Sequence, residues 1–313
     1  MTRTRRTATA LFLLAAIAGT ACGVNPPGST TPDTTAPTTA PTTTTTPPAQ
    51  SACAATTSPP VHYDHVIVFA FENRTWSTVG GPGFAGMPYL HSLATDCASF
   101  SEWLESDDTQ NSGTQYVSQM QGDLNHTVRN DCTPSSTCES VADNLFRQAR
   151  AANLTAVNYV EGATTGCSAA GNAAKHIPAL YFHGADDAAH CNEQVRPYTE
   201  FDVNNLPDFA FVTPTLCNDG HDCPNATVDQ WASSNLGAVL QSSTYQQGRT
   251  LVEVWYDEDR PVPNLYIAPT AHHGQVTATV GYDSTLRLWE TALGLGCLGA
   301  ACTATDLRPL AGI

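Results

Sequence analysis

Acidic, amide and histidine side chains follow three apolar segments of this sequence, residues 65–71, 208–213 and 250–256. In chain order they are Glu72, Asn73, Asp219, His221, Asp222, Asp257 and Glu258. Any one of them alone is typical of a solvated loop. Carboxylate and amide oxygens also suit a hard divalent cation, however, and such an ion can activate a hydroxyl nucleophile. Three such loops on one sheet therefore predict a metal site beside a reactive hydroxyl group.

The apolar segments are expected to be strands of one sheet. Residues 65–71 are apolar without alternation, which indicates burial on both faces of a parallel sheet. Further strand-like segments are residues 155–160 and 264–268, and helical patterns cover residues 87–95, 140–153, 228–240 and 284–293. This alternation predicts an α/β fold, a three-layer α/β/α sandwich with a mainly parallel sheet. Functional groups gather at the carboxyl ends of strands in such sheets.

The first 22 residues have the pattern of a secretion signal. Arg3, Arg5 and Arg6 precede an apolar run at 8–18, which is too short to span a bilayer as a mature helix. Small residues then lead to Cys22, as in a bacterial lipobox, although Gly19 stands where an aliphatic residue is more usual. We expect cleavage before Cys22 and a lipid on its sulfur. The alternative is ordinary signal cleavage that leaves Cys22 as a spare thiol.

Residues 23–60 are rich in Thr, Pro, Ala and Ser. They offer too little apolar surface to fold, and their proline content favours an extended tether. Residues 61–313 are long enough for one domain with a full core. The expected organisation is therefore a signal, a tether and one catalytic domain.

The chain has eleven cysteines, and ten remain when Cys22 is set aside. Short spacings favour three pairs: Cys132 with Cys138, Cys217 with Cys223, and Cys297 with Cys302. Cys167 with Cys191 is a plausible fourth pair. Cys53 and Cys97 would be the remainder. Disulfides persist in exported proteins, and the chain has no C-x-x-C pair of the kind that binds zinc. The cysteines therefore indicate an exported, disulfide-bonded domain.

The formal net charge is −16, and removal of the leader arginines makes the mature chain more acidic still. It has one lysine, Lys175. Such a protein is a poor candidate for binding nucleic acid or for holding anionic lipid surfaces through basic patches. Its expected contact with a membrane is the N-terminal lipid anchor alone.

Four segments together resemble the phosphoesterase family of acid phosphatases and C-type phospholipases. They are Val-Ile-Val-Phe-Ala-Phe-Glu-Asn-Arg-Thr-Trp at 66–76, Pro-Tyr-Leu-His-Ser-Leu-Ala at 88–94, the block at 206–223 that contains Asn-Asp-Gly-His, and Val-Glu-Val-Trp-Tyr-Asp-Glu-Asp at 252–259. They keep the family's order across nearly the whole domain. The resemblance implies an alkaline-phosphatase-like sandwich that cleaves phosphate esters with a Ser or Thr nucleophile beside one divalent metal ion.

The resemblance also implies roles for individual residues. Glu72 and Asn73 would reach the metal and the phosphate, and Asp257 and Glu258 would be further metal ligands. His221 would contact the phosphoryl group or the leaving oxygen. The segment Lys-His-Ile-Pro-Ala-Leu-Tyr-Phe at 175–182 is similar to the setting of the family's other active-site histidine. His176 would then be a catalytic residue, and either it or His221 would offset the charge on the phosphoryl oxygens.

The nucleophile falls on Ser112 when Tyr116 and Gly122 are set in register with the family's pattern. The His and Pro that flank the nucleophile in small members are absent, and Thr109 and Ser118 are the alternatives.

A second departure lies near the C-terminus, where Tyr282 occupies the position of a family histidine. The upstream pair His272 and His273 could substitute for it.

These patterns predict metal-dependent hydrolysis of phosphate esters at the cell surface through a serine nucleophile. The alternative is a surface binding protein on the same fold with impaired catalysis, which the altered nucleophile segment and Tyr282 favour. A serine esterase would need a Gly-x-Ser-x-Gly elbow, and a sulfatase would need a Cys/Ser-x-Pro-x-Arg motif. The sequence contains neither.

Overall fold

The computed structural model describes residues 51–53, 58–106, 110–124, 127–164, 166–167 and 174–313. The expected signal, Cys22 and most of the expected tether lie outside the described residues. None of the described helices has the length and apolar character needed to cross a membrane.

The described residues form a nine-stranded sheet in the order β4-β3-β5-β1-β6-β7-β2-β8, with β9 paired to β2. The strands are β1 (His65–Phe71), β2 (Ala98–Leu104), β3 (Ala156–Val160), β4 (Val195–Pro197), β5 (Phe209–Thr213), β6 (Thr250–Tyr256), β7 (Val262–Ile267), β8 (Gly274–Val276) and β9 (Val280–Gly281). β1 lies between β5 and β6 and is parallel to both, whereas β7 is antiparallel to its neighbours. The mainly parallel sheet expected from the sequence is confirmed.

The helices are α1 (Trp76–Val79), α2 (Pro88–Asp96), α3 (Ser112–Gln121), α4 (Leu145–Ala151), α5 (Asp187–Gln194), α6 (Asn225–Gln241), α7 (Ser243–Gln246), α8 (Tyr282–Ala292) and α9 (Arg308–Ala311). All four helices expected from the sequence are present. α4 begins at Leu145 rather than near residue 140, because the side chain of Asn144 accepts a hydrogen bond from Arg147 N and caps the helix there. The elements that were not expected are α1, α3, α5, α7, α9, β2, β4, β8 and β9.

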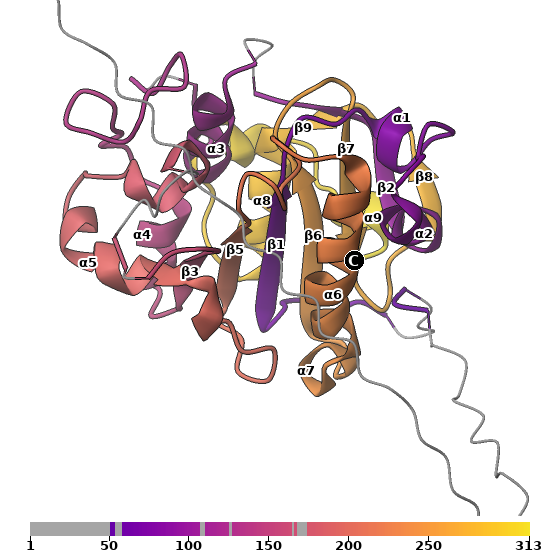
Figure 1. The fold of residues 1–313 in the computed structure, drawn as a ribbon. Helices are drawn as coiled ribbons and strands as arrows, with labels where there is room; N and C mark the ends of the chain where they lie inside the picture. The colour runs from indigo at the N-terminus through magenta and orange to yellow at the C-terminus, as the bar shows by residue number, and fades with distance from the viewer. Residues whose placement is uncertain (1–50, 54–57, 107–109, 125–126, 165, 168–173) are drawn as a thin grey trace, which may run out of the picture. The chain divides into compact units, whose positions relative to one another are not determined.

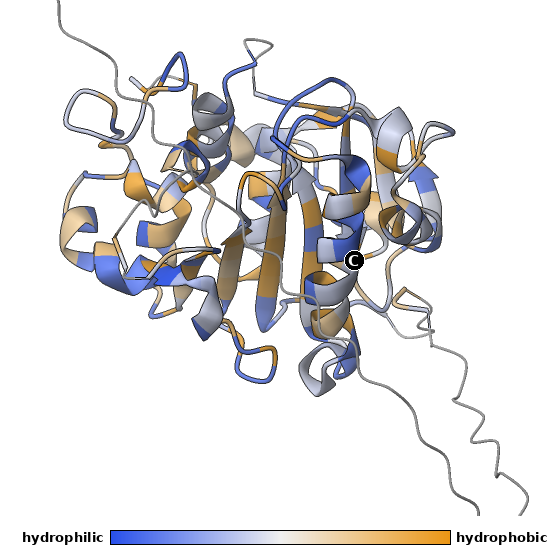
Figure 2. Ribbon diagram, viewed as in Figure 1, coloured by the Kyte–Doolittle hydropathy of each residue, from blue (hydrophilic) through white to orange (hydrophobic). Residues whose placement is uncertain are grey.

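Aromatic contacts show that helices cover both faces of the sheet. Trp231 of α6 packs edge-on against Phe69 and Phe71 of β1. On the other face, Trp289 of α8 packs against Phe209 of β5. Tyr116 of α3 packs against Trp255 of β6 on that same face. Figure 1 shows α6 in front of the sheet and α8 behind it, and Figure 2 shows how strongly apolar the strands between them are. The fold is the expected three-layer sandwich.

Five disulfides join the ten cysteines other than Cys22. Their pairs are Cys53–Cys97, Cys132–Cys138, Cys167–Cys191, Cys217–Cys223 and Cys297–Cys302, which include the three pairs expected from short spacing, the plausible fourth pair and the remaining pair. Cys53 lies within the expected tether yet is buried, so the chain is already fixed to the domain at that point. Five disulfides indicate an exported protein that folds in an oxidising compartment.

Glu253 is an acid inside the core and gives a pH-dependent prediction. It lies in the middle of β6 with no exposed surface, and Trp289 Nε1 donates to its Oε2. Burial raises the pKa of Glu253 well above its usual range, against the hydrogen bonds from Trp289 and Tyr266. The folded protein therefore keeps this carboxyl protonated at pH values where the unfolded chain, with a pKa of about 4.3, has lost the proton.

Stability should accordingly fall as the pH rises above about 4.5, because the unfolded state then binds fewer protons than the folded state. Glu253→Gln keeps the shape without the ionisable group. We expect its melting temperature to exceed that of the wild type increasingly between pH 4 and pH 8, with the two proteins close at pH 4. Glu102→Gln, on an exposed position of β2, is the control. A difference that does not change with pH would contradict this account.

Candidate active site

The register of two strands places two carboxylates side by side. Phe71 at the end of β1 is opposite Tyr256 at the end of β6. The next residues, Glu72 and Asp257, therefore leave the sheet at the same level. Side chains alternate between the faces of a sheet, so Asp257 lies on the face of Trp255, where α3 packs. The backbone N–H of Asn73 donates to Asp257 Oδ1 at 3.2 Å, which fixes the two loops to each other.

Ser112 is the first residue of α3 and lies against this pair of loops. Its Oγ donates to Glu72 Oε2 at 3.1 Å and lies 3.5 Å from Glu258 Oε1. Its side chain is 1% exposed. Ser118 follows six residues later, about 9 Å further along the helix, and Thr109 lies outside the described residues. The structure thus brings Ser112, and not Ser118, to the carboxylates.

Glu72 is held from both of its oxygens. Oε1 accepts a hydrogen bond from the Tyr116 hydroxyl at 2.6 Å, and His176 Nε2 lies 3.4 Å from the same atom. Oε2 faces Ser112 and the amide of Asn73, whose Nδ2 is 3.5 Å away. Oε1 therefore faces the side chains that hold Glu72 in place, and Oε2 faces the predicted metal site.

His176 is fully buried between two acids. Its Nδ1 lies 3.1 Å from Asp219 Oδ2, and its ring stacks on Tyr116 with centroids 5.3 Å apart. Both ring nitrogens thus face carboxylates of the protein. The sequence placed His176 in the site, and the structure shows that it lies behind Glu72 with no exposed surface.

His221 lies at the outer side of the same cluster. Its backbone N–H donates to Asp219 Oδ1 at 2.8 Å, and its Nδ1 contacts Asp222 Oδ1 at 2.7 Å. Its ring centroid is 5.7 Å from that of His176, but its side chain is 32% exposed. Of the two histidines, His221 is the one that solvent or a substrate can reach.

The carboxylates are too close together to remain charged without a cation. Ligand atoms of Glu72, Asp257 and Glu258 lie within 4.8 Å of one another, and all three residues are buried. Burial, followed by the charges of Asp257 and Asp219, raises the pKa of Glu72 well above its usual range. Burial likewise raises the pKa of Asp257, and it raises that of Glu258 to about 8, with the charge of Asp257 adding to the effect.

Two of these oxygens are buried without a protein partner. Asp257 Oδ2 and Glu258 Oε2 have no hydrogen-bond donor among the described residues. A buried anionic oxygen without a donor is costly, and a divalent cation is the group that would satisfy both oxygens at once. The donor set consists of oxygen ligands, which suits a hard cation, so the residues present fit the predicted metal ion.

A second group of possible ligands shares Glu72 and consists of Glu72, His176 and Asp219. In this group His176 Nδ1 already contacts Asp219, whereas His176 Nε2, 3.4 Å from Glu72 Oε1, makes no hydrogen bond among the described residues. The first group has two unpartnered oxygens, both from carboxylates, and is therefore the better candidate for a hard ion.

A family model described as the Phosphoesterase family matches residues 54–262, which is about two thirds of the chain. The chain belongs to the Phosphoesterase family. A probable acid phosphatase of Kluyveromyces lactis is 30% identical over 89 residues, which are 27% of this chain and 21% of that protein. An acid phosphatase of Aspergillus fumigatus is 32% identical over 89 residues, 27% of this chain and 20% of that protein. The matches thus span about a fifth of these curated relatives.

Solved structures of low identity share the fold of this phosphoesterase-family chain. A murine ectonucleotide pyrophosphatase/phosphodiesterase superposes with a TM-score of 0.54 at 9% identity, over 79% of this chain and 100% of that one. A protein of the alkaline phosphatase superfamily from Vibrio parahaemolyticus gives 0.51 at 10% identity, over 82% of this chain and 71% of that one. The alkaline-phosphatase-like architecture expected from the sequence is confirmed.

Tyr282, in place of the family histidine, lies at the first residue of α8. Its carbonyl oxygen accepts a hydrogen bond from Gln119 Nε2 on α3. Gln119 is seven residues from Ser112, about 10 Å along the helix. His272 donates its backbone N–H to Ala311 O near the C-terminus. Among the described residues, no hydrogen bond or ion pair joins Tyr282, His272 or His273 to the carboxylates.

The sequence did not reveal the role of two further residues. Tyr116 served only to set the register of Ser112, yet its hydroxyl is the strongest support of Glu72 Oε1. Asp219 was among the polar residues after the third strand, but nothing indicated that it would face His176. The spacing of Ser112 and Tyr116, four residues apart, would have placed both on one face of a helix if the helix had been recognised.

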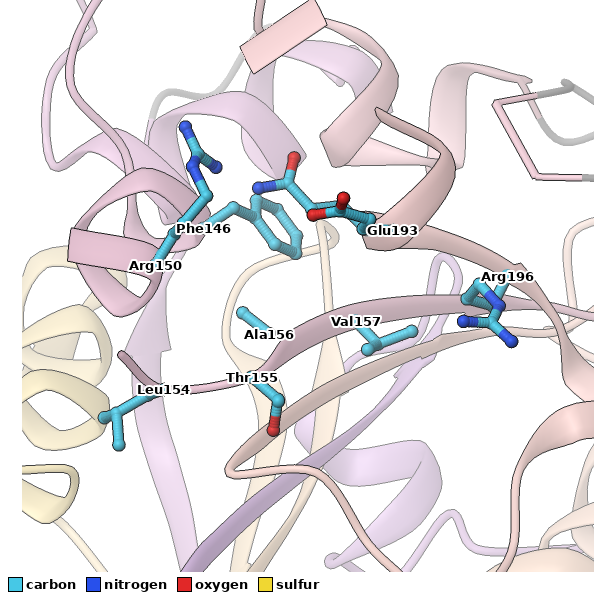
Figure 3. A pocket seen from close by; sticks show the side chains of 9 residues that line it. Phe146, Arg150, Leu154, Thr155, Ala156, Val157, Glu193 and Arg196 are labelled. Atoms are coloured by element: carbon cyan, nitrogen blue, oxygen red, sulfur yellow. The ribbon is translucent and has the colours of Figure 1, made fainter. Parts of the chain in front are cut away.

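A pocket of about 290 Å³ lies elsewhere in the fold. Figure 3 shows Phe146 above Ala156 and Val157, with Arg150, Glu193 and Arg196 around it. Ala156 is opposite Phe209, which is itself opposite Val66 near the start of β1. The floor of the pocket is therefore roughly 20 Å along the strands from Glu72 and takes no part in the site.

The metal site predicts a ligand-linked change in stability. A divalent cation at a hundredfold excess over its Kd should raise the melting temperature by about 5–10 °C relative to chelator-treated protein, because it binds only the folded state. Asp257→Asn should remove this increase. Glu193→Gln, at an exposed acid in the wall of the remote pocket, should keep it. A screen of Mg²⁺, Mn²⁺, Ca²⁺ and Zn²⁺ by thermal melts checks the prediction, and equal shifts in both variants would contradict it.

Proposed function

We propose that this phosphoesterase-family protein hydrolyses phosphate esters, with Ser112 as the nucleophile beside a divalent ion held by Glu72, Asn73, Asp257 and Glu258. The observation that carries the proposal is the 3.1 Å contact of Ser112 Oγ with Glu72 Oε2, beside buried oxygens of Asp257 and Glu258 that have no protein donor among the described residues. An exposed loop serine would not be enclosed in this way. Membership of the family and the names of its acid phosphatases support the reaction class.

The bound ion would lower the proton affinity of the serine hydroxyl and offset charge on the phosphoryl oxygens. The protein's own side chains position the nucleophile. Glu72, fixed by Tyr116 and His176, holds the Ser112 hydroxyl by a hydrogen bond. Ser112 stands at the N-terminus of the ten-residue helix α3, where the helix dipole favours negative charge.

The reaction proceeds in two transfers at Ser112. Before the first transfer the Ser112 hydroxyl loses its proton to solvent. Its Oγ then attacks phosphorus, the bond to the leaving oxygen breaks, and a phosphoserine forms. In the second transfer water attacks the phosphoserine, which frees phosphate and leaves the Ser112 oxygen unprotonated again. His221 can donate a proton to the leaving oxygen and then take one from water, because it is partly exposed. Its Nδ1 is engaged by Asp222, so Nε2 is the atom for this exchange.

His176 acts through Glu72 in this proposal and does not touch the phosphoryl group. Its ring is fully buried and both of its nitrogens face acids. This differs from the role that the family resemblance implied. Residues that orient a metal ligand typically affect metal affinity by about 10–100-fold.

The location of the site is a separate part of the proposal. Five disulfides agree with export. We infer that Cys22 carries a lipid and that residues 23–50 lift the domain from the membrane, since that segment is rich in Thr and Pro. The site would then meet substrates outside the cell.

The nucleophile is tested by Ser112→Ala. We expect turnover of 4-nitrophenyl phosphate that chelator abolishes in the wild type, and a loss of at least about 10³-fold in kcat in the variant. Acid quenching during turnover, followed by mass spectrometry, should find a phosphate on the peptide containing Ser112. Ser118→Ala, on the same helix, is the matched control and should retain most activity. Full activity of Ser112→Ala would refute the assignment, and metal binding without any turnover would favour the surface binding protein.

The role of His176 is tested by His176→Gln. We expect the Kd of the metal ion, measured by calorimetry, to rise by about 10–100-fold, with the KM for the ester little changed at saturating metal. His221→Gln should show the opposite pattern, a reduced kcat with unchanged metal affinity. An unchanged metal Kd with a raised KM in His176→Gln would mean that His176 contacts the substrate instead.

A further inference from the structure

Lys175 is the only lysine of the chain and immediately precedes His176. Its ammonium lies 3.0 Å from Asp131 Oδ2, and its side chain is 25% exposed. Burial opposes the charged form, but the ion pair with Asp131 and the charges of Glu72 and Glu258 raise the pKa of Lys175. A permanent positive charge therefore stands beside the acidic cluster with access to solvent.

Asp131 connects this charge to the nucleophile. Its second oxygen, Oδ1, accepts a hydrogen bond from the backbone N–H of Gly113 at 3.3 Å. Gly113 directly follows Ser112, so a single carboxylate separates the ammonium from the N-terminus of α3. Asn130 and Asp131 both have positive φ angles, 53° and 51°. Non-glycine residues persist in this conformation where the surroundings require it, often at ligand sites.

Two arginines near the cluster are engaged in hydrogen bonds and ion pairs within the protein. The guanidinium of Arg74 donates to the carbonyl oxygens of Glu72, Asn73, Gly220 and Cys223 and to the side chain of Asn225. Arg260 pairs with Glu105. Among the described residues, Lys175 forms an ion pair with Asp131. Asp131 also accepts a hydrogen bond from the backbone N–H of Gly113, the residue after Ser112.

We propose that Lys175 makes this site selective for phosphate monoesters over phosphate diesters, by exchanging its ion pair with Asp131 for one with the phosphoryl group at Ser112. The inference rests on the proposed function and specifies its substrate class. At neutral pH a monoester carries two negative charges on its phosphoryl oxygens and a diester carries one. The ammonium therefore stabilises the monoester more, in a site whose other side chains are acids.

Two chromogenic substrates with the same leaving group measure this selectivity. They are 4-nitrophenyl phosphate, a monoester, and bis(4-nitrophenyl) phosphate, a diester. We expect Lys175→Met to lower the monoester-to-diester ratio of kcat/KM by about tenfold. This is the lower end of the range for loss of one charge-assisted hydrogen bond, because the diester also loses part of its contact with the ammonium. Lys175→Arg should keep the ratio within about threefold of the wild type because it retains the charge.

Competitive inhibition by inorganic phosphate gives a second test, in which substitutions of Asp131 and Lys175 should have opposite effects. Asp131→Asn keeps an acceptor for Gly113 N–H but releases the ammonium. Competitive inhibition by phosphate should become about three- to tenfold tighter in this variant and at least tenfold weaker in Lys175→Met. Arg249→Met is the control for loss of one positive charge, since Arg249 pairs with Asp64 at the opposite end of β1. It should change neither quantity.

The failures of the two proposals are distinguishable. A wild type that turns over neither ester with metal present refutes the hydrolysis itself. Phosphate binding by calorimetry, weaker in Lys175→Met than in the wild type, would then still support the contact. A wild type that prefers the diester, or a Lys175→Met protein that loses both esters equally while its melting temperature is unchanged, overturns the role of Lys175 and leaves the hydrolysis intact.

Discussion

The structure depends on a cluster of buried carboxylates that the sheet forces together. Parallel strands β1 and β6 end at the same level, and the chain places Glu72 and Asp257 directly after them. Neither residue has exposed surface. Burying like charges side by side is unfavourable unless a counter-charge is present. The cluster therefore suits the proposed cation, and the residues around it keep its carboxylates in place.

Several residues hold the loops that carry these carboxylates, mostly through backbone atoms. Arg74 ties the carbonyl oxygens of Glu72 and Gly220 together and also bonds Asn225 at the start of α6. The disulfide Cys217–Cys223 closes the same loop. Asn73 adopts a positive φ of 51°, with its N–H on Asp257 Oδ1. The ligand oxygens are thus positioned while two of them are left without protein donors among the described residues.

The sheet and much of the carboxylate cluster at its edge could be predicted from the sequence because local patterns encode them. An apolar run that ends in Glu72-Asn73 specifies both a buried strand and the polar group at its end. α3 could not be predicted in this way, since its sequence Ser-Gly-Thr-Gln-Tyr-Val-Ser-Gln-Met-Gln has little apolar periodicity, yet every residue of it is buried. Its helical state depends on packing against β6 and α8 rather than on local preference.

The role of His176 was beyond the sequence for a different reason. A His-x-Pro-x-x-Tyr-Phe setting identifies a histidine near the site but does not say which groups its two nitrogens face. That depends on the long-range meeting of η1 (Ala174–His176) with α3 and with the loop after β5. Contacts between segments so far apart in the chain are set by tertiary structure, which one sequence does not display.

Net charge adds a constraint on how such a site can work. A protein of formal charge −16 repels anionic esters, but at physiological ionic strength charges more than about 8 Å apart are largely screened. The encounter is therefore decided by groups close to Ser112. The acids Glu72, Glu258 and Asp131 act against an approaching phosphate, and the proposed ion, the N-terminus of α3 and the Lys175 ammonium act for it. Because the chain has no second lysine to take its place, the proposed selectivity rests on one side chain, whose partner Asp131 a phosphoryl group must displace.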